Sequence, residues 1–261
     1  MDPALQELLR VGNEHDAISA IVRLDPLAPL PDRIRLVVRF GDIATVRVRR
    51  GDVAESYACE AVASFKAPYR LMPEPAASLA TGTTIADATD LRRRDDWPTG
   101  DGVLIAALDW GFDFTHPDFR HPDGSTRLRA LWDQSASYDP AHPNLYGYGR
   151  IHLRQDIDHA LASEAPFRAL GYDPRRSDHG PGAHATHVMG IAAGNGRVAP
   201  VGVAPQAELA FVQLAPSNGR PGRAPLTDSP AVLEGLHFID TLAGADAACI
   251  NMSLGDRKSV V

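Results

Sequence analysis

An ionisable side chain stands where the most apolar stretch of this sequence ends. Six apolar residues in succession, Val103 to Leu108, predict a strand buried on both faces, and the run breaks at Asp109-Trp110-Gly111. Functional sites of open α/β sheets lie at the carboxyl ends of the strands, so the carboxylate of Asp109 is a candidate for such a site. The competing interpretation is that Asp109 only begins a turn, which Gly111 would favour.

A second group of candidates is a cluster of imidazoles. After His179 the chain passes from glycines and a proline into an apolar run that closes on Gly194-Asn195-Gly196, which predicts a loop feeding a helix of about ten residues. His184 would lie in the first turn of this helix, and His187 one turn later. Spaced imidazoles are common zinc ligands, so a metal site is an alternative, although no HExxH-type pattern accompanies them.

A third stretch, Ala247 to Gly255 (AACINMSLG), predicts another buried strand. The order of an Asp-terminated strand, a His-bearing helix and a strand ending in Ser-Leu-Gly resembles the first half of the subtilisin-like serine proteases. The resemblance rests on LIAALDWGFDFTHPDF, HATHVMGIAAG, GVAPQAELAFVQL and INMSLG, which follow the family's order over roughly residues 98 to 256. A weaker likeness to the germination-type bacterial subtilases rests on LWDQ, GYGR and the DID-AL pattern.

The resemblance implies a serine endopeptidase that hydrolyses peptide bonds through a Ser-His-Asp triad. Asp109 matches the family's acid and His184 its base, while His187 matches a second histidine with a packing and hydrogen-bonding role. In this chemistry the imidazole takes a proton from a serine hydroxyl, and the carboxylate holds the imidazole in the required tautomer. The segment Ser253, Leu254 and Gly255 matches the strand that binds the backbone of a peptide or protein substrate as an added antiparallel strand.

Three residues depart from the family's pattern beside these catalytic candidates. Trp110 replaces a small Ser or Thr, Ala185 replaces a Gly, and Met189 replaces a small Ala. None of the changes removes a reacting group. Each alters the packing next to one, and catalysis is sensitive to displacements of about 1 Å.

No nucleophile can be assigned within these 261 residues. The family's serine lies in a Gly-Thr-Ser-Met-Ala-like turn downstream of the Ser-Leu-Gly strand, with the oxyanion-hole Asn between the two, and neither is present. We therefore expect the serine to lie beyond the end of the chain, and the chain to be a fragment without peptidase activity of its own. The alternative is a catalytically dead, subtilase-like protein that acts by binding or regulation.

No cofactor is expected, apart from a structural calcium ion for which Asp118 is a weak candidate. Asp118, in HPDF, matches an acid that in many family members helps to bind a structural calcium ion through oxygen ligands. Because the loop from Gly194 to Pro200 is shorter than the calcium-binding version, we favour an exposed Asp that caps a turn. Asp118 therefore stays a weak calcium candidate.

The composition is that of an ordinary globular protein, with 44% apolar and 23% charged residues. A net charge of -7 without a dense Lys/Arg block argues against nucleic acid or an anionic membrane as a partner. No run approaches the roughly 20 apolar residues of a membrane span. The first residues show no export-signal pattern, which favours a cytoplasmic location. Cys59 and Cys249 are expected to be two buried thiols rather than a disulfide.

The alternation of strands and helices predicts an α/β fold, with a doubly wound, mostly parallel sheet that is an incomplete subtilisin-like domain over residues 85–261. Residues 1–72 predict a small α+β unit whose position resembles that of a propeptide, which in the family assists folding and blocks the cleft. A structural or docking module is the alternative. Residues 73–84 are expected to be a linker, and 135–176 an insertion that acts as a substrate gate. The other predicted elements are helices at 4–11, 52–61, 85–94, 183–193 and 230–243, and strands at 17–24, 34–40, 43–48, 62–65, 128–132 and 208–214.

Overall fold

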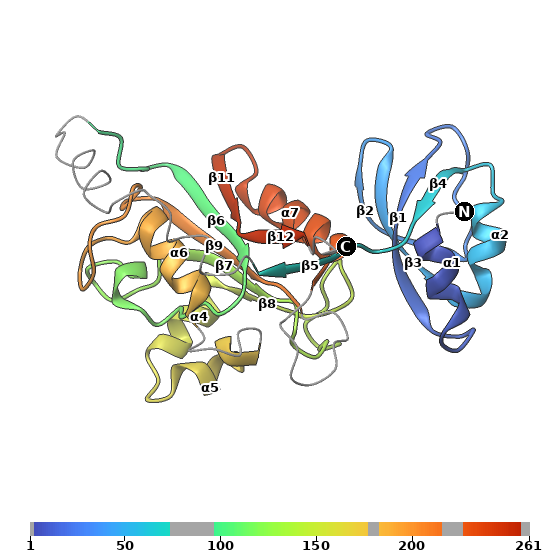
Figure 1. The fold of residues 1–261 in the computed structure, drawn as a ribbon. Helices are drawn as coiled ribbons and strands as arrows, with labels where there is room; N and C mark the ends of the chain where they lie inside the picture. Colours follow the sequence, from blue (N-terminus) through green and yellow to red (C-terminus); the bar gives the residue numbers. More distant parts are fainter. Residues whose placement is uncertain (1–2, 74–96, 177–182, 216–226, 257–261) are drawn as a thin grey trace, which may run out of the picture.

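Residues 3–66, which we call the N-terminal unit, form a four-stranded antiparallel sheet with two helices on one face. The computed structural model describes residues 3–73, 97–176, 183–215 and 227–256 (Figure 1). In this sheet the strands run in the order β2-β3-β1-β4, and Leu5 and Val53 of the helices share one core with the strands. The strands are β1 (Ala17–Leu24), β2 (Ile34–Phe40), β3 (Ile43–Arg49) and β4 (Val62–Lys66), and the helices are α1 (Pro3–Arg10) and α2 (Val53–Tyr57).

The second sheet is mostly parallel and contains the strand that ends at Asp109. Its strands run in the order β11-β6-β9-β7-β8, of which the first four are parallel and β8 is antiparallel to β7. This confirms the predicted α/β class with a mostly parallel sheet. The strands are β6 (Val103–Asp109), β7 (Leu128–Asp133), β8 (Arg150–Leu153), β9 (Glu208–Gln213) and β11 (Ala247–Met252).

Helices cover both faces of the second sheet, as Figure 1 shows. Helix α6 (His184–Ala193) belongs to the core cluster around Phe112 and Phe211, and α7 (Ser229–Ala243) to the cluster around Trp132 on the other face. Helix α7 begins where its N-cap Asp228 accepts a hydrogen bond from the amide of Ala231. Its opposite side contacts β1, β2 and β3, so α7 lies between the two sheets.

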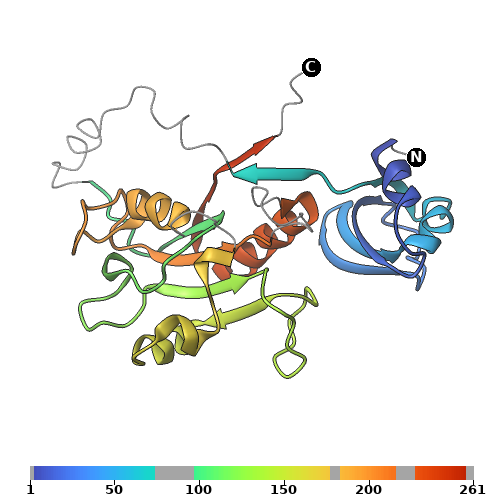
Figure 2. The ribbon, with the colours of Figure 1, turned by 60° about the horizontal axis from the view of Figure 1, so that its bottom comes forward.

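A third, small sheet joins segments that are far apart in the sequence. Strand β5 (Arg70–Pro73) lies between β10 (Thr227–Asp228) and β12 (Leu254–Asp256) and is antiparallel to both. Figure 2 shows β5, which follows the N-terminal unit in the chain, side by side with β12. No strand is expected from the sequence at Arg70–Pro73, so β5 is a finding of the structure.

Other expectations need correction. The helix expected at 52–61 is shorter, because a 3-10 turn at Arg50–Asp52 precedes α2 and the helix ends at Tyr57. The strand expected from Ala247 to Gly255 stops at Met252, and β12 follows as a separate strand. The insertion at 135–176 contains β8, α4 (Arg154–Leu161) and α5 (Pro166–Leu170). The predicted linker, apart from Pro73, and the helix at 85–94 lie outside the described residues.

The prediction of two thiols rather than a disulfide is confirmed, because both cysteines are free, but their expected burial is wrong. Cys249 is exposed and Cys59 is half-buried. Within the described residues β11 pairs only with β6, so it is an edge strand, and its side chains are less covered than those of the inner strands. The described part of the chain contains no helix that is both long and apolar enough to cross a membrane.

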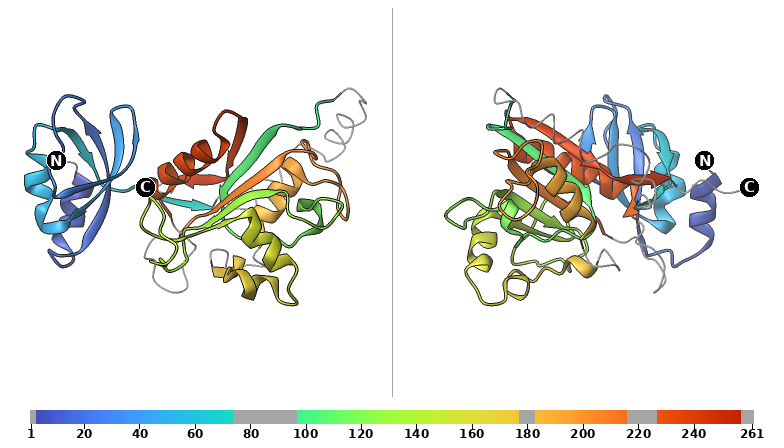
Figure 3. Two further views of the ribbon diagram at one scale, coloured as in Figure 1. Left: turned by 180° about the vertical axis from the view of Figure 1, so that it is seen from behind. Right: turned by 60° about the vertical axis from the view of Figure 1, so that its left-hand side comes forward.

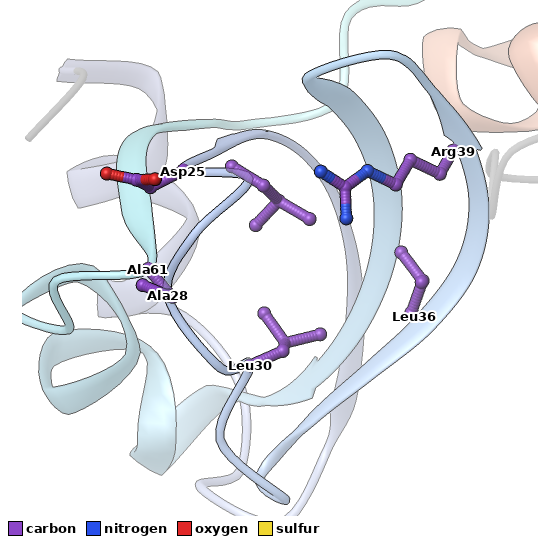
Figure 4. Close-up of a pocket in the computed structure, with 7 residues that line it drawn as sticks. Asp25, Ala28, Leu30, Leu36, Arg39 and Ala61 are labelled. Carbon is purple, nitrogen blue, oxygen red and sulfur yellow. The ribbon is translucent and has the colours of Figure 1, made fainter.

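The N-terminal unit contains a small hollow of about 80 Å³ between the turn after β1 and strand β2 (Figure 4). Arg39 and Leu36 of β2 face Ala28 and Leu30 across it. Small-molecule sites enclose roughly 300 Å³ or more, so this hollow is too small for a ligand.

Candidate active site

Asp109 is the last residue of β6, a strand with neighbours on both sides. Strands β9 and β11 flank β6, and the Asp109 side chain is fully buried. Its Oδ1 accepts a hydrogen bond from the backbone amide of Trp110, with an N–O distance of 2.7 Å. A buried carboxylate at the carboxyl edge of the sheet needs further donors, because an uncompensated charge there would be costly.

His184 supplies such a donor. It is the first residue of α6, and its Nδ1 lies 2.9 Å from Oδ1 of Asp109, while 23% of the imidazole side chain remains exposed. A proton on Nδ1, donated to the carboxylate, selects the tautomer whose lone pair is on Nε2. The arrangement is therefore that of a carboxylate that orients a base.

The backbone around the two residues fixes their relative position. Helix α6 has no side-chain cap, and its first amides donate instead to the loop that follows Asp109. The amide of Ala185 donates to the carbonyl of Trp110 (2.9 Å), and the amide of Thr186 donates to the carbonyl of Gly111 (3.3 Å). The loop also donates in return, from the Asp113 amide to Oγ1 of Thr186 at 2.8 Å. These bonds satisfy amides that a helix start leaves without partners, and they hold His184 beside Asp109.

Gly111 permits the turn between these segments, because its φ of 70° lies in the left-handed region that favours glycine. The three departures from the family pattern are accommodated within the cores. Trp110 packs in the cluster on the α7 face, and Met189 packs in the cluster on the α6 face. Ala185 is fully buried. The 2.9 Å contact between Asp109 and His184 forms with all three in place.

The other histidines do not join this pair in the described residues. His179 lies outside the described residues, and His187 is exposed, so the packing role expected for it is not seen. The described residues contain no group of three or more His, Cys, Asp or Glu side chains placed to hold a metal ion.

Asp118 is buried, not exposed as expected. Only 1% of its surface is accessible, and its two carboxylate oxygens accept hydrogen bonds from the amides of Val198 (2.9 Å) and Ala199 (3.1 Å). Both amides are donors, whereas calcium binds oxygen ligands. The carboxylate therefore holds the loop after α6 through its amides, as a cap does.

The residues expected to bind a substrate backbone lie on both sides of a strand break. Leu254 and Gly255 belong to β12 and pair with Pro73 and Met72 of β5. Ser253 lies between β11 and β12, and its Oγ accepts a hydrogen bond from Nδ2 of Asn251 at 3.0 Å. The position opposite β12 is thus taken by the chain's own β5.

Sequence reasoning missed a buried polar network at the same edge of the sheet. Gln213 ends β9 and lies between two acids, with Asp109 at the end of β6 on one side and Asp133 at the end of β7 on the other. The hydroxyl of Tyr172 donates to Oε1 of Gln213 (2.6 Å), whose Nε2 lies 3.3 Å from Oδ1 of Asp133. Burial raises the pKa of Asp133 and raises that of Tyr172 well above its usual value. The available signal was a polar residue at the end of each of three apolar strands.

Comparisons with known proteins were made against family models, solved structures and curated proteins. The model of the Subtilase family matches residues 100–261. Among solved structures, the Clostridium perfringens CspB protease is 28% identical with a TM-score of 0.49, over 62% of this chain and 30% of that one. The chain therefore spans less than a third of the length of that protein. No curated protein matches the chain.

Proposed function

Because the chain belongs to the subtilase family, we propose that it supplies the acid, the base and part of the substrate cleft of a subtilisin-type serine endopeptidase. The observation that carries this proposal is the 2.9 Å contact between the buried Asp109 carboxylate and Nδ1 of His184. In the proposed reaction Nε2 of His184 takes the proton of a serine hydroxyl, and Asp109 stabilises the imidazolium that forms. The same imidazolium then gives its proton to the leaving amine.

The serine and the oxyanion-hole Asn belong, in this proposal, to sequence outside the 261 residues, because no Gly-Thr-Ser-Met-Ala-like turn occurs within them. We expect the 261-residue polypeptide to show no peptidase activity, and a version extended through such a turn to be active. The extended protein, rather than this chain, is then the enzyme.

The proposed division of the chain is a propeptide-like unit at residues 1–72, a linker at 73–84 and the N-terminal part of the catalytic domain at 85–261. The support comes from β5, which follows the N-terminal unit and is inserted between β10 and β12. Its residues Met72 and Pro73 pair with Gly255 and Leu254, where a substrate strand would bind. A segment held there would exclude a peptide substrate, so the unit would inhibit the site that it covers.

The test uses the extended protein and hydrolysis of a chromogenic peptide. Asp109→Asn and His184→Ala should each lower kcat by about 10⁴-fold, since each removes one member of the acid-base pair. His187→Ala is the matched control, because this imidazole lies one turn further along the same helix and is exposed. Full activity in His184→Ala, or failure of the wild-type extended protein to react with a sulfonyl fluoride, would show that the proposal is wrong. Such a result would favour a protein that acts by binding.

A further inference from the structure

The N-terminal unit is held against α7 by a buried ion pair. Arg47 of β3 donates from both terminal nitrogens to the two carboxylate oxygens of Glu234, with both N–O distances at 2.8 Å. The Glu234 side chain is fully buried, and 20% of the Arg47 side chain is exposed. Burial acts to lower the pKa of Arg47, but its bonds to Glu234 raise the value overall, so the guanidinium is charged at neutral pH.

Neighbouring apolar residues close the same interface. On β3, Val46 and Val48 face the core of the N-terminal unit, so Arg47 between them faces α7. A register shift between Leu36 and Val38 interrupts the pairing of β2 with β3. Both Val37 and Val38 are buried in the core cluster around Trp132, which also contains residues of the second sheet and of α7. Figure 3 shows the N-terminal unit beside α7 from two further sides.

A loop of the insertion, residues 144–149, also contacts the N-terminal unit, because Arg47 lies over its Tyr148 ring. The side chain of Asn144 fixes this loop, because its Oδ1 accepts from the amides of Tyr146 (3.0 Å) and Gly147 (2.9 Å) and its Nδ2 donates to the carbonyl of Tyr148 (3.0 Å). The Tyr146 ring stacks on Trp132 with centroids 4.2 Å apart. The bonds of Asn144 and the stacking of Tyr146 on Trp132 thus help to shape the loop.

The docked unit contacts this loop through Arg47 of β3, and it contacts α7 through Phe40 of β2. The Arg47 guanidinium carbon lies 5.5 Å from the centroid of the Tyr148 ring, a distance at which a cation and an aromatic face attract. His237, one turn after Glu234 on α7, lies between the loop and β2. Its Nδ1 is 3.1 Å from the Tyr146 hydroxyl, and its ring meets the edge of Phe40 at 5.8 Å. The loop 144–149, helix α7 and the N-terminal unit thus meet around the buried pair of Arg47 and Glu234.

We propose that Glu234 and the loop 144–149 form a receptor that selects the chain's own N-terminal unit, with Arg47 as the recognised residue. A buried carboxylate without its cation is strongly unfavourable, so a unit with an apolar residue or lysine in place of Arg47 would be rejected. In this proposal this part of the insertion binds the unit, while the substrate gate expected for residues 135–176 stays a prediction. The inference deepens the proposed function, because the unit it selects places β5 in the cleft.

The experiment measures binding and needs no catalysis. A recognition sequence for a specific protease is placed within residues 74–96 of the full chain, the chain is cut there after folding, and the dissociation of the N-terminal fragment is followed. The wild-type halves should stay together. Arg47→Met, Arg47→Lys and Glu234→Gln should each weaken binding by roughly 100-fold or more, because each leaves a buried group without its partner. The double variant Arg47→Met with Glu234→Met should bind better than either single variant that breaks the pair.

Matched controls remove charges that do not take part in the pair. Arg49→Met changes an exposed arginine two residues further along β3, and Asp240→Asn changes an exposed carboxylate on α7. Both should bind as the wild type does. Circular dichroism of each uncut variant checks that it has folded. Tyr148→Leu tests the loop and should also weaken binding.

Equal binding of the pair variants and the controls would overturn the inference. So would a double variant that binds no better than Arg47→Met, because the two residues would then be uncoupled. Neither result concerns the triad. Conversely, an extended protein without peptidase activity would contradict the proposed function and leave this binding result standing.

Discussion

Arg127 offers the sharpest test of how α6, the helix that begins at His184, is held in place. Only 3% of its surface is exposed, and its guanidinium donates to the carbonyls of Asp118 (2.9 Å), Ala193 (2.6 Å) and Ala207 (2.6 and 3.1 Å). Burial lowers the pKa of Arg127 to about 10, so the group is still charged at neutral pH. Arg127 thus connects the last residue of α6, Ala193, to Asp118 and to Ala207 just before β9.

Replacement of Arg127 by Met should destabilise the chain by about 3 kcal/mol. Hydrogen bonds from a charged donor contribute roughly 1.5 to 3 kcal/mol each, and the replacement removes four of them, two of which go to Ala207. The cost of burying the guanidinium, several kcal/mol, offsets part of that sum. The control is Arg129→Met two residues further along β7, where the partially exposed side chain pairs with Glu208 and Asp246. Pairs of that kind contribute roughly 0 to 1 kcal/mol.

Urea denaturation measures the loss, and hydrogen exchange locates it. Amides of Gly202, Val203 and Ala204 bond to carbonyls in or just after the last turns of α6, so they should exchange faster in Arg127→Met. Exchange within the N-terminal unit should not change. A free energy of unfolding within about 0.5 kcal/mol of Arg129→Met, with unchanged exchange at these amides, would refute the reasoning.

Three further predictions follow from single contacts. Burial, with a smaller effect of nearby Arg150, lowers the pKa of His152 to about 4. In the unfolded chain the pKa of a histidine is near 6.5, so between pH 6.5 and pH 4 the unfolded chain binds more protons than the folded one. The contribution of His152 to stability is complete above pH 6.5 and falls by roughly 3 kcal/mol as the pH drops to 4, and His152→Asn should flatten this part of a urea-derived stability profile. Gly235→Ala should cost about 1 to 3 kcal/mol, since its Cβ would lie 2.7 Å from Leu108, whereas Gly190→Ala, with nothing within 4 Å, should stabilise α6 by up to about 1 kcal/mol in the same assay. Calcium added to the chain should leave its melting temperature unchanged, because Asp118 already accepts two amide hydrogen bonds, and a rise would show that the carboxylate binds the ion.

Local patterns in the sequence were sufficient for the elements that carry the acid and the base. The apolar run ending at Asp109 forms β6, and the run after His184 forms α6. The turn at Gly41-Asp42 joins β2 to β3, with Gly41 at a φ of 60°. These features depend on hydrophobic period and on backbone preferences of single residues, and both are written in short stretches of chain.

The identity and order of most elements, including the two that bring Asp109 and His184 to one edge of the sheet, can therefore be predicted from the chain alone. The pairing of β5 with β10 and β12, the exposure of Cys249 on β11 and the burial of Glu234 against Arg47 follow only from the folded arrangement. Strand neighbours and buried charge pairs join residues far apart in the chain; Arg47 and Glu234 are 187 positions apart. No local period encodes such a partner, because the energy of a buried charge or an edge strand depends on what the rest of the fold places beside it.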